Sequence, residues 1–321
     1  MRKTAISLAF GLVAFPVTAQ ADCGEVSITE MNWVSAQVVT TVASFIMEQG
    51  YGCEVTTVPS DTVPAVTSLA ENGEPDIVTE LWLNSTGEVY ERLESEGKVE
   101  RVAEVLQPGG VEGWWIPTYL AEAHPELTTI EGIMANPDLV GGRFHNCPSG
   151  WGCRIVNDNL TRALNLEGGD MEIFSHGSGE TLATSLAAAY QNEEPWFGYY
   201  WAPTVVLGKF DMTRVEIGSY DEEIHAANQD ADAANPGVSD FPAAPVLTSV
   251  TAAFKEREPE IAELMSNISF ETDTMNAVLA WKDENSASAE EAAVYFLTTH
   301  QDVWADWLSD DARQKLSNVL Q

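Results

Sequence analysis

The chain has 321 residues, of which 45% are hydrophobic, 9% aromatic and 20% charged. That balance is typical of a folded protein, and the length allows two modest domains or one large one. Fifteen Lys and Arg residues against fifty Asp and Glu residues give a net charge of −35. A chain this acidic repels phosphate, so we exclude nucleic acid as a partner and expect no adhesion to an anionic lipid surface. It favours a cationic or zwitterionic partner instead.

The first 21 residues have the pattern of an export signal. Arg2 and Lys3 precede an apolar run over 5–17, and a small-x-small cleavage site follows over 19–21. We therefore expect residues 1–21 to be a signal peptide and the mature protein to be periplasmic. Residues 20–22 lack the apolar-small pattern of a lipoprotein ahead of Cys23, so we expect no lipid anchor. A buried first helix is the alternative, because the run is too short to span a bilayer.

Short apolar strands alternate with helical segments from residue 24 onward. The first part of the chain predicts strands over 26–31, 53–58 and 76–83, with helices over 36–48 and 63–71 between them. A similar series follows, with strands over 140–144, 171–174 and 196–201 and helices over 154–164 and 180–192. Repeated strand–helix–strand units predict parallel sheets with helices on both faces. Residues 220–244 are typical of a long loop, and a strand over 244–253 leads into several C-terminal helices.

This order of elements predicts an α/β fold of two lobes. The first lobe would comprise residues 22–110 and about 245–321, and the second lobe about 111–244, from the middle of the chain. Such an arrangement has a cleft between the lobes and implies hinge closure around a small molecule. We expect the protein to be a monomer.

Four cysteines in an exported chain are naturally read as two disulfides. Cys147 and Cys153 enclose only five residues, so a disulfide that closes this loop is the simplest pairing. Cys23 and Cys53 remain, and each lies just before a predicted strand, so adjacent parallel strands would bring them together. Other pairings stay open, and a metal site built on cysteine is a further alternative. No C-x-x-C spacing supports that metal site.

Motifs of the common enzyme classes are missing from the sequence. There is no G-x-S-x-G, P-loop or H-E-x-x-H pattern. His145 lies two residues from Cys147, which suggests a Cys/His nucleophile, but the expected disulfide would occupy that thiol. We therefore expect no enzyme and no cofactor. A calcium site on Asp230 and Asp232 is an alternative, although the loop lacks EF-hand spacing and a solvated acidic loop explains it equally.

Ten tryptophans are many for this length, and several lie where a ligand site is expected. Trp33, Trp82 and Trp201 each fall at the C-terminal end of a predicted strand, the edge at which open α/β sheets bind ligands. Trp114 and Trp115 lie in another strand-like run. Ring faces that converge there attract a quaternary ammonium group, a cation without hydrogen-bond donors. Core packing is the alternative for any one of these rings.

Trp151 lies inside the loop between Cys147 and Cys153 and is followed by a predicted helix. Its ring can face a cation. The backbone N–H groups of Gly152 and Cys153, at the start of that helix, can hold a carboxylate. A zwitterion such as a betaine needs this pair of contacts.

The sequence resembles the substrate-binding proteins of ABC transporters for glycine betaine, proline betaine and choline. The resemblance covers essentially the whole mature chain, and it implies a two-lobed periplasmic binding protein fold of the type II kind. Each lobe would be a mixed, mostly parallel sheet flanked by helices, with the ligand cleft between lobes and a membrane permease as partner. The segments that carry it are Asn32-Trp33, Asp76–Trp82, Gly113–Pro117, Cys147–Cys153 and Tyr199–Pro203.

In that family, three or four aromatic side chains box the trimethylammonium group of the ligand. By motif match this role falls on Trp82, Trp151 and Trp201. Trp33 and one of Trp114 or Trp115 match cage positions of the choline-binding branch.

Departures from the family pattern bear on the choice of ligand. Choline binders have an acidic residue shortly after the first-strand Trp, where this chain has Val34-Ser35-Ala36, which speaks against choline. The doubled Trp114-Trp115 suggests a tighter, more apolar box, suited to trimethylamine N-oxide. Glu112 shares a strand face with Trp114 and would hydrogen-bond such an oxide if protonated, or else it is a solvated rim residue.

The sequence thus predicts the solute-binding component of an ABC importer for glycine betaine or trimethylamine N-oxide. Choline and dimethylsulfoniopropionate are the alternative ligands. A secreted hydrolase that uses the same cleft is the alternative from another class, as is a sensory or scaffold protein whose acidic surface binds cations.

Overall fold

The computed structural model describes residues 23–320, so the expected signal peptide lies outside the described residues. Within 23–320, no helix is long and apolar enough to cross a membrane. The strands are β1 (Glu25–Met31), β2 (Glu54–Ser60), β3 (Ile77–Trp82), β4 (Val99–Pro117), β5 (Arg143–Asn146), β6 (Glu172–Ser175), β7 (Gly198–Ala202), β8 (Met212–Arg214), β9 (Ala243–Thr251) and β10 (Phe270–Glu271).

Helices separate most of these strands. Those in the first half of the chain are α1 (Val34–Ile46), α2 (Thr62–Asn72), α3 (Gly87–Ser95), α4 (Thr118–Ala123), α5 (Ile130–Ala135) and α6 (Gly152–Ala163). Those in the second half are α7 (Gly179–Gln191), α8 (Val205–Lys209), α9 (Glu222–Asn228), α10 (Ala252–Arg257), α11 (Pro259–Asn267), α12 (Thr272–Glu284), α13 (Ala289–Thr299), α14 (Gln301–Trp304) and α15 (Asp310–Val319).

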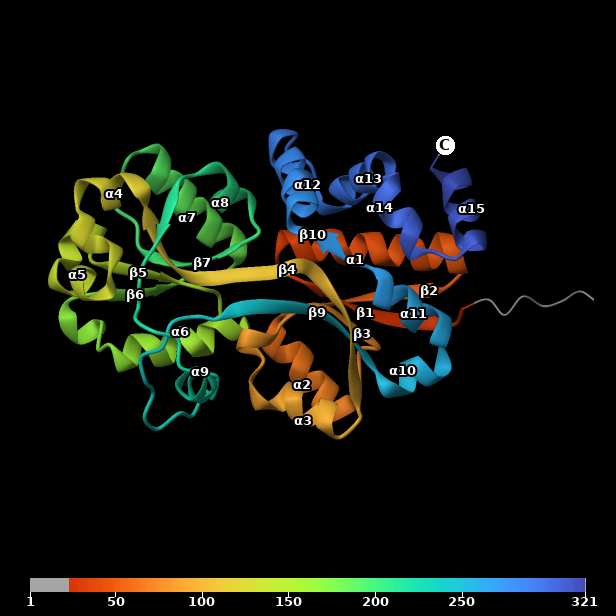
Figure 1. Cartoon of the computed structure of the whole chain (residues 1–321), viewed down its shortest axis with the longest axis horizontal. Coiled ribbons are helices and arrows are strands. Elements are labelled where there is room, and N and C mark those ends of the chain that lie inside the picture. Colours follow the sequence, from red (N-terminus) through yellow and green to blue (C-terminus); the bar gives the residue numbers. More distant parts are fainter. Residues whose placement is uncertain (1–22, 321) are drawn as a thin grey trace, which may run out of the picture.

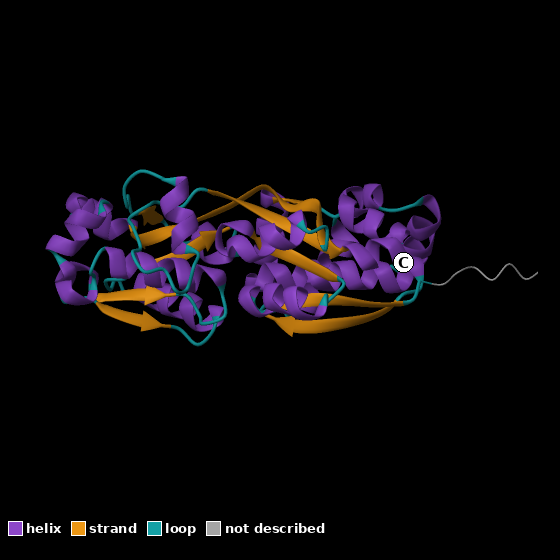
Figure 2. Cartoon of the chain, turned by 90° about the horizontal axis from the view of Figure 1, so that it is seen from below, coloured by secondary structure: helices purple, strands orange, loops and turns teal. Residues whose placement is uncertain are grey.

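The strands form one mixed, ten-stranded sheet in the order β2-β1-β3-β9-β4-β7-β5-β6, with β8 and β10 also paired to β4. The strands at both ends of the sheet are parallel to their neighbours. In the middle, β9 runs antiparallel to β3 and to β4, and β4 runs antiparallel to β7. The molecule divides into two bodies, each a part of this sheet flanked by helices (Figures 1 and 2). We call the body with β1–β3 and α10–α15 lobe A, and the body with α4–α9 and β5–β8 lobe B.

The 19-residue strand β4 belongs to both lobes. Its first part pairs with β9, whereas from Val111 onward it pairs with β7 and then with β8. In Figure 1, β4 and β9 are the two long strands that pass between the bodies. We propose that the lobes divide near residues 110 and 244, where β4 exchanges one partner strand for the other.

Helix α1 illustrates how the core of lobe A is built. Its sequence VSAQVVTTVASFI carries no charged side chain, and the residues that face the sheet and α13 are fully buried. These include Val38, Val39, Val42 and Ile46, spaced as the 3.6-residue helical period requires. A helix buried on most of its surface holds its N-terminus at a fixed place, and Trp33 lies there.

Both disulfides expected from the sequence are present. Cys23 and Cys53 lie at the starts of β1 and β2, which are parallel and in register, and their Cα atoms are 4.4 Å apart. Cys147 and Cys153 close the loop between β5 and α6. The second bridge therefore holds the segment that presents Trp151.

Two local predictions differ from the structure. The strand expected over 140–144 begins only at Arg143, because Gly141 and Gly142 adopt left-handed φ values of 82° and 63° that end the preceding turn. The stretch 220–244, expected to be a loop, contains α9. The side chain of Asp221 caps α9 by accepting the N–H of Ile224 at 3.0 Å.

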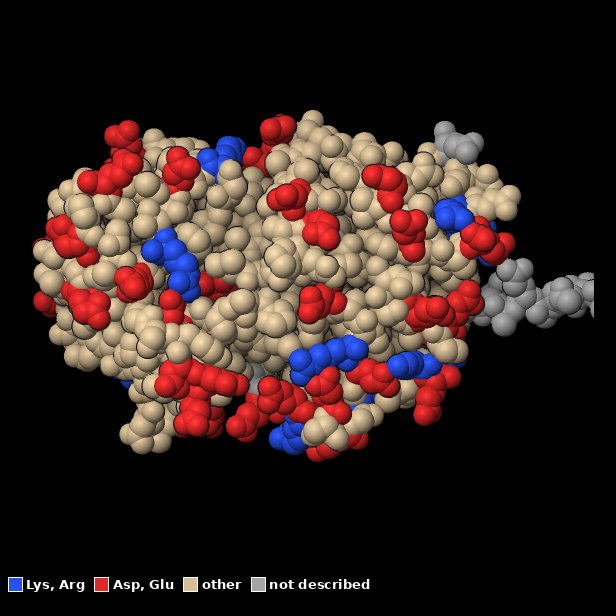
Figure 3. All heavy atoms as spheres, viewed as in Figure 1, with Lys and Arg blue, Asp and Glu red and all other residues tan. Residues whose placement is uncertain are grey.

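Acidic side chains dominate the surface, as the net charge of −35 requires. Figure 3 shows them spread over one face and gathered along its lower edge, over α3 and α9. Basic side chains on this face are few. This negative charge makes the molecules repel one another, which favours solubility. It also attracts cations to the surface.

Candidate functional site

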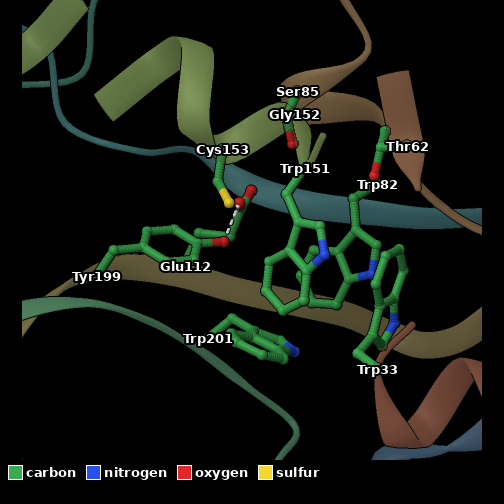
Figure 4. Close-up of a pocket in the computed structure, with 10 residues that line it drawn as sticks. All are labelled: Trp33, Thr62, Trp82, Ser85, Glu112, Trp151, Gly152, Cys153, Tyr199 and Trp201. Carbon is green, nitrogen blue, oxygen red and sulfur yellow. Dashed lines mark hydrogen bonds between the residues drawn. The ribbon is translucent and has the colours of Figure 1, made fainter. Parts of the chain in front are cut away.

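A pocket lies between the two lobes and encloses about 290 Å³ of empty space, its mouth included. Four tryptophans line it: Trp33 and Trp82 from lobe A, and Trp151 and Trp201 from lobe B. Figure 4 shows the four indoles grouped together, with a carboxyl and a phenol beside them. The other lining residues are Thr62, Ser85, Glu112, Gly152, Cys153 and Tyr199.

Neighbouring rings of this group lie nearly perpendicular to one another. The ring centroids of Trp33 and Trp151 are 5.3 Å apart at 73°, and those of Trp151 and Trp201 are 5.0 Å apart at 83°. Each of the four tryptophans is only 5–7% exposed. We call Trp33, Trp82, Trp151 and Trp201 the cage.

Hydrogen bonds orient two of the cage rings. The indole Nε1–H of Trp33 donates to Oε1 of Glu80 at 2.7 Å, and that of Trp151 donates to Oδ1 of Asn32 at 2.6 Å. Asn32 belongs to lobe A and Trp151 to lobe B, so the second bond also joins the lobes. Because a buried N–H without an acceptor costs about 1–3 kcal/mol, these acceptors restrict how each ring can turn.

The ring of Trp82 depends on a glycine in β4. A Cβ atom built on Gly110 would lie 2.2 Å from a ring carbon of Trp82 and 3.1 Å from the carbonyl oxygen of Ala202. No side chain fits at that position without moving the indole. The backbone of β4 at Gly110 therefore packs directly against one cage ring.

The stapled loop positions Trp151 directly before α6. Gly150 has a left-handed φ of 97°, and its carbonyl oxygen accepts the N–H of Val63 across the cleft at 3.1 Å. Trp151 is the N-cap residue of α6, and within residues 23–320 the N–H groups of Gly152 and Cys153 have no acceptor. These donors and the positive end of the helix dipole face the pocket and suit an anionic group.

Glu112 supplies the carboxyl group of the pocket. It is 2% exposed, and its Oε1 accepts a hydrogen bond from the Tyr199 hydroxyl at 2.7 Å. Its Oε2 is buried and has no partner within the described part of the chain. Burial raises the pKa of Glu112, with the hydrogen bond from Tyr199 partly offsetting the shift. The carboxyl is therefore protonated more readily than an ordinary glutamate, and a protonated Oε2 becomes a donor.

The lobes touch across the cleft at several points besides the cage. A ring nitrogen of His225 in α9 lies 3.1 Å from the carbonyl oxygen of Asn84 in lobe A. Lys209 of α8 and Asp283 of α12 form an exposed ion pair at 2.9 Å. Two wider grooves between the lobes flank the pocket, one beside α2, α3 and α9 and the other beside α7, α8 and α12. Because these contacts join the two lobes around the pocket, the structure has the lobes in a closed arrangement.

Most residues singled out from the sequence come together here. Trp33, Trp82, Trp151, Trp201, Glu112, Gly152 and Cys153 all line the pocket, although they derive from five separate segments of the chain.

Trp114 and Trp115, which we expected to contribute a cage ring, lie outside this pocket. Trp114 is two residues beyond Glu112 on β4, which is about 7 Å deeper into lobe B. There it is fully buried against Phe144 and Phe197, and its Nε1–H donates to Asn157 at 2.9 Å. Trp115 points to the opposite face of the strand, where its Nε1–H donates to the carbonyl oxygen of Tyr200 at 3.1 Å. Trp114 is a core residue of lobe B, and Trp115 is partly buried and packs against that core.

Sequence reasoning missed Tyr199, Thr62 and Ser85. Tyr199 lies two residues before Trp201 on β7, so the alternation of side chains along a strand would have placed both on one face. Thr62 and Ser85 follow the C-terminal ends of β2 and β3, the same edge of the sheet that bears Trp33 and Trp82.

A metal site finds no support in the geometry. Within residues 23–320, no group of three or more His, Cys, Asp or Glu side chains is arranged to hold a metal ion. Oδ1 of Asp230 accepts the backbone N–H of Asp232 at 2.9 Å, which is a local turn contact. Asp230 and Asp232 therefore belong to no such group in the described part of the chain.

Comparison with known families identifies the chain. Residues 24–299 match the family described as the substrate binding domain of ABC-type glycine betaine transport systems. The chain belongs to this family. Its members are extracytoplasmic solute-binding proteins that bind small quaternary amines and work with an ABC permease, and they are not enzymes.

Solved structures of the same fold agree with this family. A glycine betaine, L-proline-binding protein (ProX) from Borrelia burgdorferi has 16% identity and a TM-score of 0.75, covering 91% of this chain and 99% of its own. A choline-binding protein in complex with choline has 21% identity and a TM-score of 0.73, with coverages of 93% and 99%. Lactococcal OpuAC, closed on glycine betaine, has 20% identity and a TM-score of 0.69, with coverages of 89% and 100%. At these identities the likeness establishes the two-lobed fold.

The close contact between Gly110 and the Trp82 ring gives a first prediction. Gly110→Ala should lower the free energy of unfolding by about 1–3 kcal/mol, because the methyl group overlaps the Trp82 ring and the backbone of β7. Chemical denaturation with tryptophan fluorescence measures this loss. Gly208→Ala in α8 is the matched control, since no atom beyond its chain neighbours and its own helix backbone lies within 4 Å of the added Cβ. Equal stability of the Gly110 variant and the wild type would contradict the close fit.

Proposed function

We propose that this protein is the periplasmic, monomeric solute-binding component of an ABC importer and that it captures a methylated amine in the tryptophan cage. The ring faces attract a trimethylammonium group, which offers no hydrogen-bond donor. Binding makes and breaks no bond. Because each lobe supplies two of the four rings, the ligand stabilises the closed arrangement over an open one and thereby signals to the permease.

Trimethylamine N-oxide is the ligand that the site favours. The observation that carries this choice is the buried Glu112, whose Oε2 has no partner among the described residues while Tyr199 occupies Oε1. An N-oxide oxygen is a strong acceptor, and a protonated Oε2 next to the cage donates to it. The N-oxide is also compact, in keeping with the small volume of the pocket.

Glycine betaine is the second candidate, on a different observation. Its carboxylate would accept the N–H groups of Gly152 and Cys153 at the start of α6, which have no acceptor within residues 23–320. Glu112 would then have to be neutral, because two carboxylates in one buried pocket repel each other.

Calorimetric titration tests the assignment directly. We expect purified protein to bind trimethylamine N-oxide most tightly among four ligands, with glycine betaine, choline and dimethylsulfoniopropionate weaker, and with a change in tryptophan fluorescence. Recovery of each ligand unchanged after incubation checks that none is hydrolysed. Failure to bind any of the four would refute the methylated-amine assignment, and turnover of one would favour the hydrolase alternative.

The cage is tested by removing one of its rings. Trp151→Ala should weaken binding by about 1–2 kcal/mol, because one face that attracts the cation is lost. Trp281→Ala is the matched control, since Trp281 stacks on Tyr295 in lobe A and does not line the pocket. The two variants are compared by the same titration. Equal affinity of both would mean that the ligand does not use the cage.

The role of Glu112 separates the candidate ligands. For an N-oxide held by the neutral carboxyl, Glu112→Gln keeps a donor and should retain most of the affinity, whereas Glu112→Ala should lose about 1–2 kcal/mol. Affinity of the wild type should fall as the pH rises through the elevated pKa of Glu112, and Glu112→Gln should remove that fall. Choline, held by an ionised carboxylate, would give the opposite pattern, with Glu112→Gln as the damaging change.

A further inference from the structure

A second buried carboxyl, Glu80, lies behind the cage and outside the pocket. All six residues of β3 are buried, and Glu80 is 0% exposed. The pairing of β3 with β9 is irregular between Val78 and Leu81, and there Glu80 has a left-handed φ of 53°. Non-glycine residues adopt such a φ rarely, and mostly where function or close packing maintains it.

The irregularity directs the Glu80 side chain to the start of α1. Its Oε1 accepts two hydrogen bonds, from Nε1–H of Trp33 at 2.7 Å and from the Ser35 hydroxyl at 2.6 Å. Its Oε2 is buried without a partner in the described part of the chain. A buried carboxyl that is only half satisfied is unfavourable for folding, so its presence against a cage ring calls for a functional reason.

We propose that Glu80 is a positioning residue: it fixes the indole of Trp33 in the cage and, when ionised, makes that ring more attractive to a cation. The inference rests on the proposed function, because it concerns the same cage. An indole whose N–H donates to an anion gains electron density, and the ring face then attracts positive charge more strongly. Glu80 does this without touching the ligand.

Burial raises the pKa of Glu80 to about 7, with hydrogen bonding by Ser35 and Trp33 partly offsetting the shift. No charge contributes to this shift. Of the elements packed against β3, α1 and β9 carry no charged side chain. The charged groups on the other three elements are Glu25 and Glu30 of β1, Glu71 of α2, and Glu100, Arg101, Glu104 and Glu112 of β4.

The direction of the pH effect follows from this titration. A bound cation favours the ionised form of Glu80, so affinity through this group rises as the pH increases past about 7. Glu112 acts in the opposite direction for an N-oxide, because there the neutral form is needed. The two contributions are therefore separable by substituting one carboxyl at a time.

The test compares Glu80→Gln with the wild type, using tetramethylammonium and trimethylamine N-oxide as probes in calorimetry at pH 5.5 and pH 8.5. The amide keeps an acceptor for Trp33 and Ser35 but removes the charge. We expect equal affinities at the lower pH and about fivefold weaker binding by the variant at the higher pH. Equal affinities at both pH values would overturn the charge effect. Repeating the comparison in the Glu112→Gln background removes the contribution of the other carboxyl.

A second variant tests the same proposal if Glu80→Gln does not fold. Ser35→Ala removes one hydrogen bond that lowers the pKa of Glu80, so the pH midpoint of affinity should move upward while the fully ionised protein binds like the wild type. An unchanged midpoint would count against Glu80 as the titrating group. This variant leaves the Trp33 contact in place.

The ligand-free protein separates this inference from the proposed function. Tryptophan emission should change with a midpoint near pH 7 in the wild type and not in Glu80→Gln or Trp33→Phe, because only the Trp33–Glu80 bond reports the ionisation. If no amine binds but this transition occurs, the proposed function fails and Glu80 still controls Trp33. If amines bind and the transition is absent, the coupling fails and the function stands.

Discussion

A buried indole needs an acceptor for its N–H, and this requirement organises the site. Trp33 donates to Glu80, Trp151 donates to Asn32, and Trp114, deeper in lobe B, donates to Asn157. Since an unmade bond of this kind costs about 1–3 kcal/mol, each acceptor selects one orientation of its ring. For Trp33 and Trp151, polar residues around the cage thus restrict where the ring faces point. A site for a cation without donors is in this way specified by groups that need not touch the ligand.

The division of the cage between lobes links recognition to closure. Neither lobe supplies more than two of the four rings, so under the proposed function only the closed protein would surround a trimethylammonium group with all four. The direct contacts between lobes are few, and the Lys209–Asp283 pair is exposed and therefore weak. A ligand in the cage adds the contacts that these pairs alone do not supply. The affinity for the ligand and the fraction of protein that is closed are consequently linked thermodynamically.

The sequence predicts the site to the extent that local rules fix side-chain position. Trp33, Trp82, Trp151 and Trp201, which the strand ends and the Cys147–Cys153 loop single out, line one pocket in the structure. Trp114 and Trp115 are different, because whether a ring on a long strand reaches the pocket depends on where the partner strand ends, which no local pattern reveals.

Glu80 shows a second limit of local patterns. In a run of six buried residues it reads as a strand position like its neighbours, and only the irregular pairing with β9 turns it toward α1. That irregularity depends on contacts between segments about 170 residues apart, as does the hydrogen bond between Thr79 and Thr248 beside it. Helix α9 was missed for another reason: the short segment is surrounded by residues typical of loops, and its cap at Asp221 is a weak signal on its own.

Gly110 has a mechanical consequence. It lies where we propose that β4 passes from lobe A to lobe B, and it also lies directly against the ring of Trp82. A Cβ atom at residue 110 would meet both the Trp82 ring and the carbonyl oxygen of Ala202 in β7, so this glycine lets a side chain of lobe A and a strand of lobe B approach the same point of β4. A change in the angle between the lobes would alter both approaches together. The position of the Trp82 ring and the closure of the lobes would then be coupled through the backbone of β4.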